Sequence, residues 1–142
     1  MRIALLLAGV FGAFGVAPVA AGLPEELANA RERWAERGSE HYSFTISNGC
    51  YCAPADRGPV TVTVVRGEAA GPSALEPFKI SSLRITIPAL FDQMDQALRR
   101  LKAAYFQFEF DPLDGHPTRI AYDDPAIDDD QWVIVVADLK HL

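Results

Sequence analysis

The residues best suited to redox or metal chemistry are the two cysteines, Cys50 and Cys52, which are separated only by Tyr51. In an oxidising compartment, two cysteines this close pair with each other and close a local loop. On a fully extended strand their Cα atoms would lie about 6.6 to 7.2 Å apart, at the limit for a disulfide. We therefore predict a structural disulfide between Cys50 and Cys52, with the chain bending at Tyr51.

Two other functions remain open for this cysteine pair. A strained disulfide is more easily reduced, which would suit a thiol-disulfide redox factor, and two thiolates would suit soft metals such as copper. Thioredoxin-like proteins use C-x-x-C, however, and a structural zinc site needs two further ligands that no spacing in this sequence supplies. A redox or copper-handling factor is therefore the alternative to a binding domain with a structural disulfide.

An acidic segment near the C-terminus is the second candidate for chemistry. Five carboxylates fall within eight positions: Asp123, Asp124, Asp128, Asp129 and Asp130. Oxygen ligands at this density could bind calcium, although the spacing and the central glycine of an EF-hand loop are absent. A solvated acidic loop between two strands explains the same residues without an ion. We favour the solvated loop, keep calcium as the weaker alternative and predict no cofactor.

The three histidines do not form a recognisable catalytic pattern. His41, His116 and His141 fall at a strand start, in a turn and at the C-terminus. No nucleophile motif such as G-x-S-x-G and no glycine-rich phosphate loop accompanies them. His116 stands between Gly115 and Pro117, so a turn role explains it. We predict no catalytic residue and favour a noncatalytic protein over an enzyme.

The first 21 residues are typical of a cleavable signal peptide. Arg2 is followed by the apolar run Ile3–Ala17 and by the small residues Val19, Ala20 and Ala21. This pattern predicts cleavage after Ala21 and a periplasmic or secreted product. A retained membrane anchor is the alternative, because the uncharged stretch approaches the roughly 20 residues that a bilayer span needs.

Length and charge limit the remaining possibilities. The chain has 142 residues and a formal net charge of -6. The length allows one domain, predicted at residues 22–142, and the negative charge argues against a nucleic-acid partner. No second apolar segment is long enough to span a membrane once the leader is removed.

Hydrophobic periodicity predicts two helices and six strands. One helix is expected at Pro24–Arg37, with Trp34 anchoring it to a sheet, and the other follows Thr86 over residues 87–102. Alternating or β-branched runs predict strands at residues 41–47, 59–65, 105–110, 118–122 and 132–137, with a short strand at Glu68. Residues 71–82 are expected to form a crossing loop, and residues 132–137 a central strand or one covered on both sides. The expected fold class is α+β, an antiparallel sheet packed by two helices in the order αβββ-αβββ, with weak signs of a repeat.

Four segments carry a family resemblance: YSFTISNGCYC, PVTVTVVRGE, TIPALFDQMDQAL and FDPLDGHPTRIAYDD, followed by DDDQW. Together they resemble the bacterial domain-of-unknown-function family 6174. The resemblance implies a small exported or lipid-anchored envelope protein with a C-x-C pair and a D-x-x-x-G-x-P turn, and it brings no established reaction. This chain departs from the pattern at His116, where relatives tend to carry an aromatic residue, and at Gln131, where an acidic residue is usual. The expected function is an exported, noncatalytic binding or interaction domain whose partner is a small ligand or an envelope protein.

Overall fold

The computed structural model describes residues 22–51, 53–54, 57–70 and 85–142. The predicted signal peptide (residues 1–21), Cys52 and the predicted loop at residues 71–82 lie outside the described residues. Within the described part of the chain, no helix is both long and apolar enough to cross a membrane.

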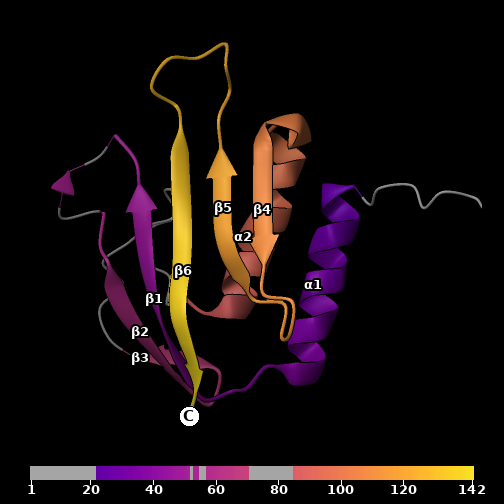
Figure 1. The fold of residues 1–142 in the computed structure, drawn as a ribbon, viewed down its shortest axis with the longest axis vertical. Coiled ribbons are helices and arrows are strands. Elements are labelled where there is room, and N and C mark those ends of the chain that lie inside the picture. Colours follow the sequence, from indigo (N-terminus) through magenta and orange to yellow (C-terminus); the bar gives the residue numbers. More distant parts are fainter. Residues whose placement is uncertain (1–21, 52, 55–56, 71–84) are drawn as a thin grey trace, which may run out of the picture.

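The described residues form an antiparallel sheet with two helices on one of its faces (Figure 1). In chain order the elements are α1 (Leu23–Arg37), β1 (Tyr42–Gly49), β2 (Val60–Val65), β3 (Glu68–Ala70), α2 (Ile87–Arg100), the 3₁₀ helix η2 (Ala103–Tyr105), β4 (Phe106–Phe110), β5 (Pro117–Tyr122) and β6 (Trp132–His141). The six strands lie in the order β3-β2-β1-β6-β5-β4, and every neighbouring pair is antiparallel. The predicted α+β class and the predicted order of helices and strands are confirmed.

Two three-stranded meanders meet at the centre of the sheet, where β1 pairs with β6. The prediction of a central strand near the C-terminus is therefore correct. The two halves are not copies in topology, because the central strand is the first strand of one meander and the last strand of the other. Alternate residues of the strands face the helices and form one core, whose largest fully buried side chains include Tyr42, Phe44, Phe91, Leu27 and Ile46.

Local sequence signals explain where the helices begin. Helix α1 has a proline in its first turn together with Glu25 and Glu26, an order that suits the helix dipole. The side chain of Thr86 caps α2 by accepting a hydrogen bond from the amide of Ala89 at 3.2 Å. Both helices therefore start close to the predicted positions.

The ends of three elements differ from the prediction. Strand β1, predicted to end at residue 47, continues through Asn48 to Gly49, because both residues pair with β6. Helix α2, predicted to run to residue 102, ends at Arg100, and Leu101 is 41 % exposed. Strand β6 runs four residues past the predicted end at Ala137, to His141. This last extension brings a histidine to the site described below.

The two helices are joined by an ion pair that sequence analysis did not anticipate. Arg31 of α1 binds both Asp92 and Asp95 of α2, at 2.7 and 2.6 Å. The guanidinium also lies over the ring of Phe91, 5.5 Å from its centroid. Arg31 thereby connects α1 to α2 through two exposed ion pairs.

Candidate functional site

The site is built on the turn between β4 and β5, which its own hydrogen bonds hold in shape. The amide of Asp111 donates to the carbonyl of His116 at 2.8 Å, and the amide of Gly115 donates to the carbonyl of Asp111 at 3.0 Å. One carboxylate oxygen of Asp111 accepts from the amides of Leu113 and Asp114, at 2.8 and 3.1 Å. The turn is therefore rigid before any ligand is considered.

Gly115 allows this turn to pack directly against α1. Its φ of 80° lies in the left-handed region, and a Cβ added there would lie 2.3 Å from the carbonyl oxygen of Ala30. Glycine is thus required for both backbone conformation and space.

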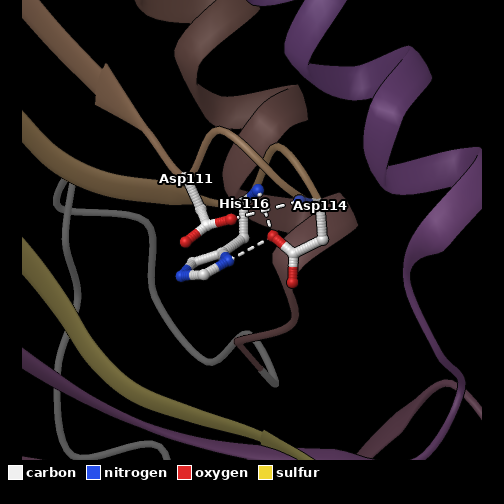
Figure 2. A group of neighbouring side chains, drawn as sticks. All are labelled: Asp111, Asp114 and His116. Carbon is white, nitrogen blue, oxygen red and sulfur yellow. Dashed lines mark hydrogen bonds and ion pairs between the residues drawn. The ribbon is translucent and has the colours of Figure 1, made fainter.

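Asp114 and His116 form a buried pair within the turn (Figure 2). Each residue is only 8 % exposed. Nδ1 of His116 lies 2.5 Å from Oδ1 of Asp114, and the same oxygen accepts the His116 amide at 3.0 Å. His116 is therefore a turn residue, as predicted, but its side chain is enclosed and bonded to a carboxylate.

A third element supplies a second imidazole to the same carboxylate. Nε2 of His141, at the end of β6, lies 3.2 Å from Oδ2 of Asp114. Trp34 of α1 borders both histidines: its ring is stacked with that of His141 and meets that of His116 edge-on. The predicted anchoring of Trp34 against the sheet also holds, because its ring packs edge-on against Tyr42 of β1.

The surroundings of Asp114 favour its charged form. Burial alone would raise the pKa of Asp114, but the His116 amide, the His116 imidazole and the His141 imidazole outweigh it and hold that pKa below its ordinary value. Asp114 therefore stays a carboxylate at neutral pH.

The turn brings three possible metal ligands together. Asp111, Asp114 and His116 each offer a donor atom, and these atoms lie within 4.8 Å of one another (Figure 2). Among the described residues this is the one such group of three or more His, Cys, Asp or Glu residues. We call Asp111, Asp114 and His116 the turn cluster.

A second feature is a hollow of about 780 Å³ at the end of the sheet beside the β5–β6 loop. Part of its lining comes from register neighbours on the sheet face away from the helices: Gln107, Ala121 and Val133. Aromatic and charged side chains also line it, among them Tyr51, Tyr105, Trp132, Arg57, Arg119 and Asp123. Its volume lies within the range of small-molecule sites.

The cysteines predicted as a site lie beside this hollow. Strand β1 ends at Gly49, and the chain bends at Cys50 and Tyr51, as the predicted loop requires. Cys50 lines the hollow. Cys52 lies outside the described residues, so its pairing with Cys50 stays a prediction.

The predicted calcium ligands lie in the β5–β6 loop and do not belong to the turn cluster. Asp124 folds part of this loop by accepting a hydrogen bond from the amide of Ala126 at 2.9 Å. Asp123 lines the hollow, and one carboxylate oxygen of Asp130 is buried without a hydrogen-bond partner. Calcium binding by Asp123, Asp124, Asp128, Asp129 and Asp130 stays an untested prediction.

The comparisons with known proteins give one result. The family of unknown function DUF6174 matches residues 26–141. The chain belongs to DUF6174. No curated protein and no solved structure matches.

For this DUF6174 protein, sequence reasoning missed the turn cluster because it treated the histidines separately and the D-x-x-D-x-H spacing as a turn alone. The D-x-x-D-x-H spacing could have predicted the turn cluster, because a short turn brings polar side chains that are two or three residues apart close together. The partnership of His141 with Asp114 had no comparable local signal, because 27 residues separate the two.

Proposed function

We propose that the protein is an exported, noncatalytic binding domain and that its ligand occupies the hollow at the end of the sheet. The observation that supports this most directly is the hollow itself, whose volume of about 780 Å³ is in the range of small-molecule sites. Apolar and aromatic groups provide contact area there, and Arg119 and Gln107 provide hydrogen-bonding groups, with Arg119 donating to Gln107 at 3.2 Å. This arrangement suits a small envelope component that has both an apolar part and a polar part.

The two tryptophans allow binding to be measured. Trp132 lines the hollow, whereas Trp34 is buried between α1 and the sheet. We would titrate the protein with muropeptides, short oligosaccharides, amino acids and small carboxylic acids while recording tryptophan fluorescence. A ligand in the hollow should change the emission of the parent protein, and the change should disappear in Trp132→Phe.

A blocking variant tests the location. Ala121→Phe adds bulk to the hollow from the face away from the core, and it should abolish binding without unfolding the protein. Thr61→Phe adds the same ring at an exposed position of β2, outside the hollow, and should bind normally. Equal binding by both variants would place the ligand elsewhere, and turnover of any of these compounds at an enzyme-like rate would refute a noncatalytic function.

The exported location rests on the sequence pattern of residues 1–21, and it is tested separately. Expression of the full chain in a bacterium, followed by N-terminal sequencing of the periplasmic fraction, should give a product that starts at Gly22. An intact Met1 on cytosolic protein would contradict export.

A thiol-disulfide or copper-handling function is the second candidate, because Cys50 lines the same hollow. Measuring the reduction potential of the cysteine pair distinguishes the two functions. A reduction potential below about -300 mV is expected for a structural disulfide. A reduction potential of about -120 to -200 mV would favour a thiol-disulfide redox function.

A further inference from the structure

The turn cluster contains two carboxylates that no lysine or arginine among the described residues neutralises. These carboxylates belong to Asp111 and Asp114. Arg37, on the adjacent helix, donates instead to the carbonyl of Leu113 at 3.3 Å. Two neighbouring carboxylates repel each other when both are charged, and a bound cation would relieve that repulsion.

One carboxylate oxygen of the turn cluster is available for a ligand within the described residues. Oδ1 of Asp111 accepts the two turn amides, and its second carboxylate oxygen has no hydrogen bond to a described residue. His116 is nine-tenths buried, and its Nδ1 is bonded to Oδ1 of Asp114, so a metal ion at this nitrogen would replace that bond.

We propose that Asp111, Asp114 and His116 bind a zinc ion. Two carboxylate oxygens and one imidazole nitrogen are donors that zinc accepts, whereas calcium and magnesium prefer oxygen alone. Three protein ligands leave a fourth position for water. The preformed turn lowers the entropic cost of bringing these ligands together, because five of its residues are already fixed by backbone and carboxylate hydrogen bonds.

Zinc binding at the turn cluster requires only a small rearrangement. Nδ1 of His116 and Oδ1 of Asp114 are 2.5 Å apart, whereas two ligands on one tetrahedral zinc ion are about 3.3 Å apart. The ion would replace the hydrogen bond between them, and the proton of the neutral ring would then be carried by Nε2. His141 would keep its contact with Oδ2 of Asp114 and would position that carboxylate.

Zinc titrations of the full chain, freed of metal with a chelator, test this proposal. We expect a saturable, single-site binding isotherm by calorimetry and a rise in the thermal unfolding midpoint. His116→Gln and Asp111→Asn should each weaken zinc binding about tenfold or more. Removing a group that only hydrogen-bonds to a metal ligand already costs that much affinity, so removing a ligand should cost at least as much. His41→Gln, which changes an exposed histidine outside the turn cluster, should leave zinc binding unchanged.

Asp111→Asn keeps the test valid if the histidine variant fails to fold. Asparagine retains an oxygen that accepts from the amides of Leu113 and Asp114, so the turn should persist while the charge is lost. Asp128→Asn serves as the control for the acidic β5–β6 loop. The proposal would be overturned if zinc binding survived Asp111→Asn or were lost in Asp128→Asn instead. It would also be overturned if calorimetry showed no binding heat at millimolar zinc.

Discussion

Tyr42 of β1 and His141 of β6 are cross-strand partners on the helix-covered face of the sheet. Strict alternation from the buried Val136 would place His141 on the opposite face. The strand instead contains one extra residue, because Thr45 pairs with Ala137 while Ser43 pairs with Lys140. This bulge directs His141 toward Trp34 and Asp114, as bulges commonly redirect side chains.

The bulge depends on the backbone conformation of Asp138, whose φ is 54°. Asp138→Val should lower the free energy of unfolding by about 1 to 2 kcal/mol, because a β-branched residue is strained in the left-handed region. Asp138→Gly should cost less than Asp138→Val, since glycine adopts this conformation freely even though the hydrogen bond from Thr45 to the Asp138 carboxylate is lost. Urea denaturation measures both, and Lys140→Val is the control for a valine on the same strand without a positive φ. Equal stability of the two valine variants would refute this account of the bulge.

The packing of the β4–β5 turn on α1 can be tested at Gly115. Gly115→Ala should lower the free energy of unfolding by about 2 kcal/mol or more, because its Cβ would meet the carbonyl oxygen of Ala30 at 2.3 Å as well as straining the backbone. Gly67 provides a matched control: its φ is 75°, close to the 80° of Gly115, and nothing lies within 4 Å of an added Cβ.

The difference between the two glycine variants isolates the steric cost of the contact with α1. Gly67→Ala should cost about 1 kcal/mol, which is the conformational penalty alone. Denaturant titrations of both variants give the comparison. If Gly115→Ala were no worse than Gly67→Ala, the turn would not be held against the helix.

The contact between the helices predicts a modest, salt-dependent effect at Arg31. Its side chain is 39 % exposed, so solvent screens the pairs with Asp92 and Asp95. Arg31→Ala should lower the free energy of unfolding by about 0.5 to 1 kcal/mol, and the loss should shrink in high salt. Arg31→Lys should recover only part of it, because one ammonium cannot reproduce the two-pronged guanidinium.

Arg100→Ala is the control for removing a positive charge, because Arg100 is exposed at the end of α2. Its effect on stability should be smaller than that of Arg31→Ala at low salt. Urea denaturation at low and high ionic strength measures both variants. Identical losses would mean that Arg31 acts through overall charge and not through its two carboxylate partners.

The sequence was sufficient to predict the elements because their signals are local. Alternation in residues 106–110 and the i, i+3, i+4 pattern of α2 need no knowledge of the rest of the chain. The convergence of Asp114 and His141 could not be predicted, since it depends on the pairing of β6 with β1 and on a bulge at Asp138 that no local pattern marks. The carboxylates and imidazoles of the site were visible as residues, but their proximity is a property of the sheet.

Tyr42 links β1 to the start of α2, and this link predicts a dependence of stability on pH. Its hydroxyl oxygen accepts a hydrogen bond from the amide of Ile87 at 2.9 Å. Because Ile87 is the first residue of α2, its amide has no partner within the helix. Tyr42→Phe leaves that amide buried and unpaired, so it should lower the free energy of unfolding by about 1 to 2 kcal/mol.

Burial raises the pKa of Tyr42, an effect that the Ile87 amide opposes only in part. The folded protein therefore holds the phenol proton more tightly than the unfolded chain, whose tyrosines ionise near pH 10. The stabilisation is fully present below about pH 10 and is lost as the pH rises toward the raised pKa of the folded state. Urea denaturation at about pH 8 and about pH 11 should show the stability gap between the parent and Tyr42→Phe narrowing at the higher pH. Tyr51→Phe, at a ring that is 74 % exposed, should show no such change, and a gap for Tyr42 that stays constant would contradict the role of burial.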